Sequence, residues 1–166
     1  MASNAPPPAA AAPMEPAAEP GPLSELLCFD LYAASRSVTA VYRPLLEPLG
    51  LTYPQYLVLV VLWRHDRRAV CDLVAELRLD YNTVSPLLKR LEARGLLRRQ
   101  RRAEDERSVE VTLTAAGRAL QTQAAHIPDV LDQALGLDGA TLTRLQSLLR
   151  YIVTSTVGHT ARNTPR

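Results

Sequence analysis

Residues 79–117, LDYNTVSPLLKRLEARGLLRRQRRAEDERSVEVTLTAAG, carry the most informative pattern in the sequence. The first part of this stretch predicts a helix, because Asp80 is a good N-cap residue and apolar residues recur after it at helical spacing. Gly95 is a suitable left-handed stop, so the helix is expected to end near Arg94. Pro86 lies inside this segment and removes one backbone hydrogen bond, so a local bend is expected there.

The second part of the stretch predicts a β-hairpin. Residues 96–102 and 108–113 flank the polar turn 103–107, and apolar and polar residues alternate along the second of these segments. Between Lys89 and Arg107 the chain carries eight basic residues against four acidic ones. The cations on and beside the turn are Arg98, Arg99, Arg101, Arg102 and Arg107. This density of positive charge suits a polyanion such as nucleic acid.

Helices are predicted on both sides of this stretch. Most begin at a residue that caps helices well, although the short helix that begins at Val70 follows Ala69 and lacks such a cap. The expected segments are residues 24–47, 52–64, 70–78, 114–132 with an interruption near Pro128, and 138 onward, and their caps are Ser24, Thr52 with Gln55, Thr114 and Asp138. The expected fold class is therefore mainly α with a small β-hairpin.

A short helix, a tight turn, a second helix and a basic hairpin form the plan of a winged helix-turn-helix. Such a fold places one helix in the major groove of double-stranded DNA and needs hydrogen-bonding side chains near the start of that helix. The residues expected to bind DNA are Tyr81, Asn82, Thr83, Ser85, Lys89 and Arg90 on the helix, with Arg101, Arg102 and Arg107 on the hairpin. The face expected to pack inward consists of Val84, Leu87, Leu88 and Leu91.

These residues also resemble a known family. Residues 79–117 resemble the DNA-binding core of MarR-family regulators, and DERSVEVTLTAAG at residues 105–117 is similar to that family's wing motif. The stretch LLCFDLYAASRSVTAVYRPLLEPLGLTYPQYLVLVVLW, residues 26–63, resembles the organic-hydroperoxide-sensing, OhrR-type branch. The similarity covers about residues 24–125. The chain departs from the family at Tyr81 and Asn82, where relatives carry smaller residues.

The resemblance implies a homodimer in which each subunit places one helix in the major groove and one wing in the minor groove of a pseudo-palindromic operator. It implies that Arg107 is the wing-tip residue and that Asp105 orients it through an ion pair. It also implies that Cys28 senses organic hydroperoxides and accepts hydrogen bonds from Tyr42 and Tyr53. The expected function is a transcriptional repressor that leaves its operator when Cys28 is oxidised.

The spacing around Cys28 fits a sensor at a dimer interface. Cys28 lies four residues after Ser24, near a helix N-terminus, where the helix dipole favours the thiolate that attacks peroxides. Tyr42 lies 14 residues beyond Cys28, about 21 Å along a straight helix, so the two cannot touch within one chain. Two copies of the helix that cross antiparallel near Ser35 would bring Cys28 to the partner's Tyr42 at two identical sites. The helical stripe concerned carries Cys28, Tyr32, Ser35, Thr39 and Tyr42. With the resemblance, this stripe makes Tyr32, Tyr42 and Tyr53 the expected residues of the sensor pocket.

Two other functions stay open on the residues alone. In the first, a small aromatic ligand releases the regulator and Cys28 is inert; its pocket would be lined by Tyr32, Tyr42, Tyr53, Tyr56 and Trp63. In the second, the protein is a thiol peroxidase that uses Cys28, although the sequence has no evident Cys–His arrangement and the basic hairpin would be idle. Oxidised Cys28 is expected to form a mixed disulfide with a small thiol, without participation of Cys71. A Cys28–Cys71 disulfide is the alternative.

Composition sets the remaining bounds. Residues 1–22 contain 15 Ala or Pro and predict a disordered tail. No apolar run is long enough to cross a membrane and no signal peptide is evident, so a cytoplasmic protein is expected. Two cysteines and three scattered histidines predict no metal site, and neither a cofactor nor an enzymatic activity is expected. The expected domain spans residues 23–158, with a DNA-binding core at about 53–113, dimerisation helices at about 24–47 and 114–158, and a flexible end at 159–166.

Overall fold

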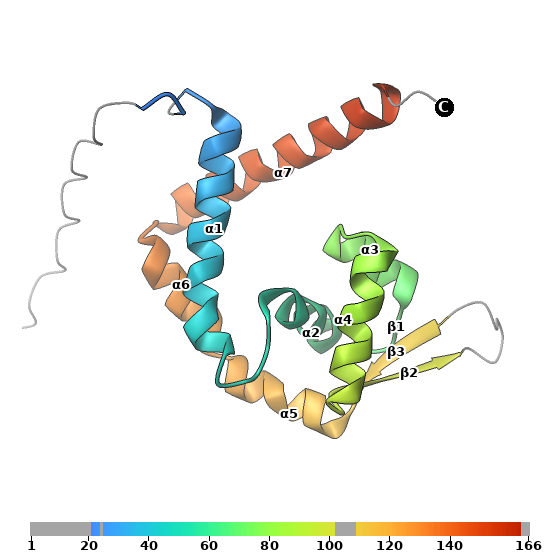
Figure 1. Cartoon of the computed structure of the whole chain (residues 1–166). Helices are drawn as coiled ribbons and strands as arrows, with labels where there is room; N and C mark the ends of the chain where they lie inside the picture. The colour runs from blue at the N-terminus through green and yellow to red at the C-terminus, as the bar shows by residue number, and fades with distance from the viewer. Residues whose placement is uncertain (1–20, 24, 102–108, 164–166) are drawn as a thin grey trace, which may run out of the picture. The chain divides into compact units, whose positions relative to one another are not determined.

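The computed structural model describes residues 21–23, 25–101 and 109–163, with side chains described as far as residue 156 (Figure 1). The chain divides into two compact units, Met1–Arg36 and Ser37–Arg166. Helix α1, Leu27–Leu46, begins in the first unit and ends in the second. Several predicted features lie outside the described residues: most of the tail, the Ser24 cap, the turn 103–107 with Asp105 and Arg107, the neighbouring Arg102, and residues 164–166 of the predicted flexible end.

The second unit is mainly helical, as the sequence predicts. Six helices follow α1 within the described residues. They are α2 Tyr53–Arg64, α3 Val70–Leu77, α4 Tyr81–Ala93, α5 Ala115–Ala124, α6 Ile127–Leu135 and α7 Gly139–Asn163. The last helix continues past residue 158, where the domain was expected to end.

Local sequence chemistry explains where these helices begin and end. Within the described residues, the predicted caps at Thr52 with Gln55, Asp80, Thr114 and Asp138 form, and α3 begins after Ala69 without a side-chain cap, also as predicted. Gly95 follows α4 with a positive φ of 69°, which confirms it as the left-handed stop. The capping hydrogen bonds run from Thr52 N–H to Gln55 Oε1 (2.9 Å), from Thr83 N–H to Asp80 Oδ1 (2.8 Å), from Gly117 N–H to Thr114 Oγ1 (3.0 Å) and from Thr141 N–H to Asp138 Oδ1 (2.7 Å).

The interruption predicted near Pro128, in the helix expected over residues 114–132, is a complete break, and the second part ends at Leu135. The structure has two helices there, because α5 ends at Ala124 and α6 begins at Ile127. Pro128 lies in the first turn of α6, where a missing backbone N–H removes no intrahelical bond. Ala124 and Ile127 are both buried, so each helix is attached to the core beside the break.

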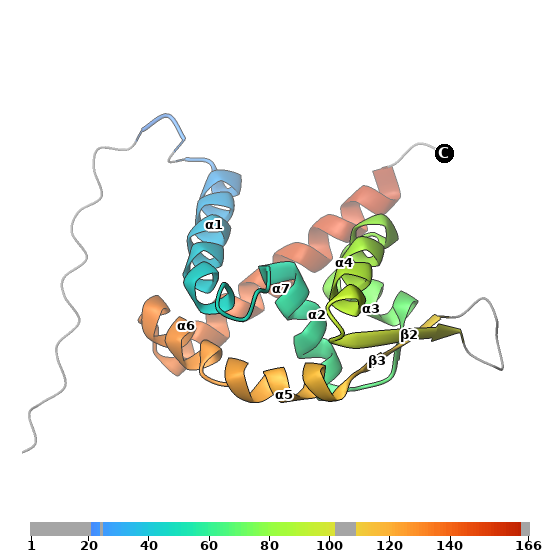
Figure 2. The same cartoon turned by 60° about the horizontal axis from the view of Figure 1, so that its bottom comes forward.

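Three short strands form an antiparallel sheet of order β1–β3–β2. Strands β2 Leu97–Arg101 and β3 Val109–Leu113 confirm the predicted hairpin, and Arg99 pairs with Val111 in its register. Strand β1, Arg68–Ala69, was not predicted, because two residues carry no alternating pattern and the strand exists only through its pairing with β3. Helix α4 packs against β2 on the other edge of the sheet (Figures 1 and 2).

The core joins α2, α3, α4 and α5 to the sheet. Val84, Leu87, Leu88 and Leu91 are at most 8% exposed, which confirms the predicted inward face of α4. One polar contact also crosses this core, since Trp63 Nε1–H donates to the backbone oxygen of Gly117 at 2.9 Å. Other residues with almost no exposed surface are Val58, Leu59, Leu62, Leu73, Leu97, Val111 and Ile127.

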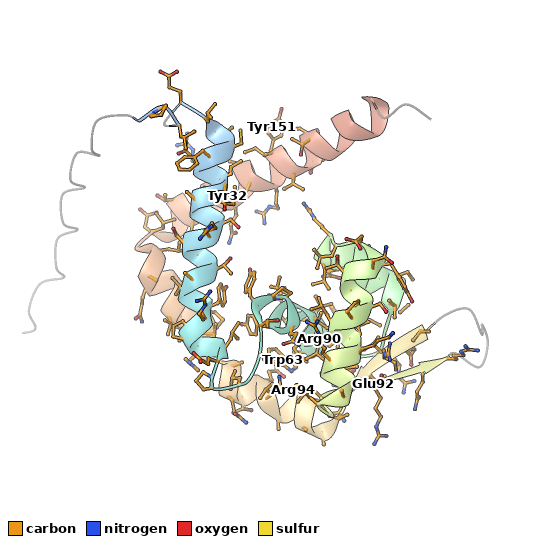
Figure 3. All side chains as sticks on the ribbon, viewed as in Figure 1. Tyr32, Trp63, Arg90, Glu92, Arg94 and Tyr151 are labelled. Carbon is orange, nitrogen blue, oxygen red and sulfur yellow. The ribbon has the colours of Figure 1, made fainter. Side chains whose placement is uncertain are left out.

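Helix α7 keeps much of its apolar surface exposed. Its Tyr151 is 71% exposed and Leu148 is 53% exposed, and Figure 3 shows Tyr151 on this helix. The neighbouring Leu145 and Leu149 are exposed as well. Among the described residues, no helix combines the length and the apolar character that crossing a bilayer requires.

Candidate nucleic-acid interface and thiol site

The helix-turn-helix consists of α3, the turn at residues 78–80 and α4. Arg78 ends α3 in the left-handed conformation, with φ at 54°, and so turns the chain toward α4. Helix α3 is anchored by buried Val70 and Leu73. Because both helices bury their apolar faces, the polar face of α4 is left to solvent.

The side chains predicted to contact DNA gather on that polar face. Ser85 is half-buried, and the others are exposed: Tyr81, Asn82, Thr83, Lys89 and Arg90. Tyr81 is 59% exposed, an unusual placement for a large ring. Figure 3 shows Arg90 on the same helix.

Thr83 also has a structural task. Its hydroxyl donates to Asp80 Oδ2 at 2.7 Å, and its backbone N–H donates to Asp80 Oδ1 at 2.8 Å. These hydrogen bonds, led by the hydroxyl, lower the pKa of Asp80. The Thr83 hydroxyl therefore has only its acceptor capacity left for a DNA base or phosphate.

The cations of β2 divide into two groups. Arg98 and Arg101 are exposed, as a contact to phosphate requires. Arg99 instead pairs with Glu92 of α4, with 2.6 Å between Arg99 Nη2 and Glu92 Oε2. Arg99, one of the cations counted on the predicted hairpin, thus has its guanidinium bound to a carboxylate of the protein. Sequence reasoning did not identify Glu92 as the partner of Arg99, although the two residues are only seven positions apart.

Arg94 is a second cation that the protein uses internally. Its Nη2 donates to the backbone oxygen of Leu49 at 2.9 Å, and its Nη1 donates to that of Gly50. Gly50 has a positive φ of 63°, and a Cβ there would lie 2.9 Å from Arg94 Nη2. Arg94 thus ties the end of α4 to the loop before α2 (Figure 3).

The base of the hairpin is held by Asp66, which sequence reasoning also missed. Asp66 Oδ1 accepts the backbone N–H of Leu113 at 2.8 Å, and its Oδ2 accepts from Arg118 Nη1 at 3.0 Å. No local pattern marks Asp66, because Leu113 is 47 residues away. A polar hollow of about 410 Å³ lies here, lined by Asp66, Arg67, Arg98, Gln100, Thr112, Leu113, Thr114, Ala115 and Arg118.

Cys28 and Tyr32 belong to the first unit. Cys28 is a free thiol in the first turn of α1, and its side chain is exposed. Tyr32 is 57% exposed and accepts a hydrogen bond from Arg36 Nη1 at 2.9 Å. The Arg36 guanidinium also lies 5.5 Å from the centre of the Tyr32 ring. Within this unit, the Tyr32 hydroxyl is thus the acceptor of a hydrogen bond from Arg36. A role of Tyr32 in the sensor pocket stays a prediction.

Tyr42 and Tyr53, the other predicted pocket residues, lie together in the second unit. Their ring centres are 4.5 Å apart, and Tyr56 lies 5.8 Å from Tyr42. Burial, followed by the charges of Tyr53, Tyr56 and Asp132, raises the pKa of Tyr42 to about 12. Burial raises the pKa of Tyr53 and Tyr56 as well. Within the described residues, no hydrogen bond uses the phenol oxygens of these three tyrosines.

The second cysteine lies on the helix-turn-helix. Cys71 is a free, exposed thiol on α3, and its Sγ lies 3.9 Å from Asp72 Oδ1. The described part of the chain holds no cluster of three or more side chains that could bind a metal ion. The chemistry that the described residues offer is thus DNA contact through α4 and β2, and thiol chemistry at Cys28 and Cys71.

Comparison with known proteins agrees with this interface. A family model for the transcriptional regulator SarA/Rot matches residues 40–123. The organic hydroperoxide resistance transcriptional regulator of Bacillus subtilis (strain 168) is 45% identical over 127 residues, or 76% of this chain and 86% of that protein. Reduced AbfR of Staphylococcus epidermidis, solved bound to DNA, is 30% identical with a TM-score of 0.70, covering 81% of this chain and 94% of AbfR. AbfR has also been solved in an overoxidised form on DNA and in a disulfide form.

A third similar protein is BpsR of Bordetella bronchiseptica, whose DNA binding is regulated by 6-hydroxynicotinic acid. It is 29% identical with a TM-score of 0.70, covering 76% of this chain and 98% of BpsR. These similarities extend over the helix-turn-helix, the strands and the helices around them. Taken with the exposed cations of α4 and β2, they show that the chain is a DNA-binding transcriptional regulator of the MarR/SarA family, and not an enzyme.

Proposed function

We propose that the protein is a homodimeric repressor that leaves its operator when organic hydroperoxides oxidise Cys28. Two separate observations support this proposal. Cys28 is an exposed, free thiol in the first turn of α1. The rings of Tyr42 and Tyr53 lie 4.5 Å apart, and their phenols have no hydrogen-bond partner among the described residues. Support for the proposal also includes the similarity to a regulator of organic hydroperoxide resistance.

The dimer places these groups together across subunits. Exposed Leu27 on α1 and exposed Leu148 and Tyr151 on α7 provide apolar surface that a second copy would bury. We assign dimerisation to residues 24–47 and 114–158 and DNA binding to about 53–113. Antiparallel crossing of two α1 helices would set each Cys28 against the partner's Tyr42 and Tyr53, giving two identical sites by two-fold symmetry.

The DNA-binding residues act on both grooves in this proposal. Helix α4 enters the major groove, where Tyr81, Asn82 and Ser85 face base edges and Lys89 and Arg90 face phosphates. The wing follows the adjacent minor groove with Arg101, Arg102 and Arg107, and Asp105 orients Arg107. A two-fold dimer then requires half-sites about one helical turn apart, or a multiple of it, in a pseudo-palindromic operator.

The chemical step is a two-electron oxidation of one thiolate. The Cys28 thiolate attacks the terminal oxygen of the hydroperoxide, and the O–O bond breaks. The alkoxide that leaves takes up a proton and becomes an alcohol. The sulfur is now a sulfenic acid. A small thiol then displaces water from it to give a mixed disulfide, with Cys71 as the alternative thiol.

This oxidation must change the affinity for DNA strongly. Moving a two-state protein from almost fully bound to almost fully released takes about 5.5 kcal/mol of differential stability. A single modified side chain achieves this only by shifting an element that has two packed arrangements, and the α1 crossing is that element in our proposal. Its movement changes the distance between the two α4 helices of the dimer.

A gel shift tests the proposal with the protein's own upstream DNA, with and without tert-butyl hydroperoxide. The wild-type complex should dissociate, and Cys28→Ser should stay bound at the same oxidant concentration. Cys71→Ser is the matched control, since it also removes one exposed thiol, and it should respond like the wild type. Release of the Cys28→Ser protein from DNA by the oxidant would refute the role of Cys28 as the sensor. Intact-mass analysis without reductant separates a mixed disulfide from a Cys28–Cys71 bridge.

One observation favours a second candidate, which is release by a small aromatic ligand. The rings of Tyr42, Tyr53 and Tyr56 are contiguous, and Trp63 extends the row with its ring centre 6.0 Å from Tyr56. The regulation of BpsR by 6-hydroxynicotinic acid supports this candidate. Release of the Cys28→Ser protein by an aromatic acid without any oxidant would favour it over oxidation.

A further inference from the structure

One carboxylate joins α4 to the edge strand β2. Arg99 Nε and Nη2 donate to Glu92 Oε2 at 2.8 and 2.6 Å, and the backbone N–H of Arg99 donates to Glu92 Oε1 at 2.9 Å. The side chains of Arg99 and Glu92 are only 26% and 33% exposed. Glu92 therefore holds both the side chain and the backbone of the strand residue.

The backbone contact has a clear reason in the topology of the sheet. In the order β1–β3–β2, strand β2 is at an edge, so the N–H groups on its outer side have no strand partner among the described residues. Glu92 lies in the last turn of α4 and accepts one of these N–H groups, that of Arg99. Charge-assisted hydrogen bonds of this kind are stronger than an ordinary surface ion pair. The hydrogen bonds between Arg99 and Glu92 thus hold β2 against the end of α4.

Exposed cations lie on both elements that the Glu92–Arg99 contact connects. Lys89 and Arg90 are exposed on α4, and Arg98 and Arg101 are exposed on β2. The phosphates of a duplex lie at fixed spacings, so cations on two elements contact one duplex together only if the elements keep a fixed relative position. A carboxylate that faced the phosphates directly would repel them, whereas Glu92 is occupied by Arg99.

We propose that Glu92 is a positioning residue for DNA binding, which acts through Arg99 to hold β2 against α4 so that the cations of both elements contact one operator together. The hydrogen bonds from Arg99 also lower the pKa of Glu92, so the carboxylate stays ionised near neutral pH. The inference depends on the DNA-binding activity of the family and not on oxidation of Cys28. Its test therefore uses fully reduced protein.

The test compares Glu92→Gln with a matched control, Glu76→Gln. Glu76 of α3 pairs with Arg68 of β1 at 3.1 Å, so it is also a carboxylate that joins a helix of the helix-turn-helix to a strand. Both substitutions remove one negative charge and change the general attraction to DNA by the same amount. Binding is measured over a series of salt concentrations, with a duplex that the wild-type protein selects from a random pool.

We expect Glu92→Gln to weaken binding to the selected duplex by about tenfold. The slope of log K against log salt should fall by about one for each cation that leaves its phosphate. Glu76→Gln should keep the wild-type slope. An affinity and a slope for Glu92→Gln that match Glu76→Gln, or a steeper slope because a freed Arg99 contacts phosphate, would overturn the proposal.

A second variant keeps the test valid if Glu92→Gln folds poorly. Arg99→Lys preserves the positive charge and the backbone N–H but cannot make the paired bonds of the guanidinium. We expect it to fold and to show a smaller loss of affinity, again with a lower salt slope. An unchanged slope in Arg99→Lys would contradict the positioning inference. Far-UV circular dichroism at the binding temperature shows that each variant is folded.

Discussion

Replacing Gly117 by Ala should destabilise the protein where α5 meets the hairpin. A Cβ at this position would lie 2.0 Å from the backbone oxygen of Leu96 and 3.1 Å from Leu113 Cδ2. No side-chain rotation can relieve the first contact, because the Leu96 oxygen belongs to the backbone. Either α5 or the start of the hairpin must move away.

Movement of either segment strains two hydrogen bonds. The Leu96 oxygen accepts the backbone N–H of Thr114 at 3.1 Å, and the Gly117 oxygen accepts Trp63 Nε1–H at 2.9 Å. Overpacking costs about 1–3 kcal/mol, and each weakened hydrogen bond adds about 1 kcal/mol. Helix propensity opposes this, because Ala is favoured over Gly by about 1 kcal/mol inside a helix. We expect a net loss of about 3 kcal/mol, which lowers Tm by about 10 °C.

Thermal and urea unfolding, followed by circular dichroism at one protein concentration, measure this loss. Gly139→Ala is the matched control, because Gly139 begins α7 and a Cβ there meets nothing within 4 Å. The control should leave stability unchanged or raise it slightly. If Gly117→Ala stays within about 0.5 kcal/mol of the wild type, the close approach of α5 to Leu96 is refuted.

Two further predictions concern titratable groups. The pKa of Tyr42 lies near 12 in the folded protein against an ordinary 10, so its contribution to stability is complete below pH 10 and is lost as pH rises through 12. Tyr42→Phe should therefore move the midpoint of alkaline unfolding, measured by circular dichroism, to higher pH. An unchanged midpoint would contradict the raised pKa of Tyr42. Asp80→Ala should lower Tm by a few degrees and weaken DNA binding, because α4 loses its cap, whereas Asp80→Asn keeps an acceptor for Thr83 and should lose less. Because the pKa of Asp80 is lowered, its contribution is present above its ordinary pKa and is lost as pH falls through the lowered value, so Asp80→Ala should flatten the acid end of the stability profile.

Local sequence chemistry was enough to predict most elements of the second unit. The caps at Asp80, Thr114 and Asp138 each join residues three positions apart, so a short window of sequence contains both partners. The alternation along β3 likewise predicted buried Val111 and Leu113. Exposure of the polar face of α4 followed from the same periodicity.

The break between α5 and α6 shows where local patterns give an incomplete answer. Pro128 indicated an interruption, but it is equally compatible with a kink and with the first turn of a new helix. Burial of Ala124 on one side and Ile127 on the other decides between them, because two separate helices let both residues reach the core. A charge count likewise does not reveal that Arg94 and Arg99 have acceptors within the protein.

The helices, their caps, the hairpin and the polar face of α4 can be predicted from local sequence, because each depends on residues within a few positions of one another. The folded chain is needed to see that Asp66 accepts from Leu113, 47 residues away, and that Trp63 donates to Gly117, 54 residues away. Folding also creates β1 and brings the rings of Tyr42 and Tyr53 together. Such contacts depend on how the elements pack, and no spacing along the chain encodes them.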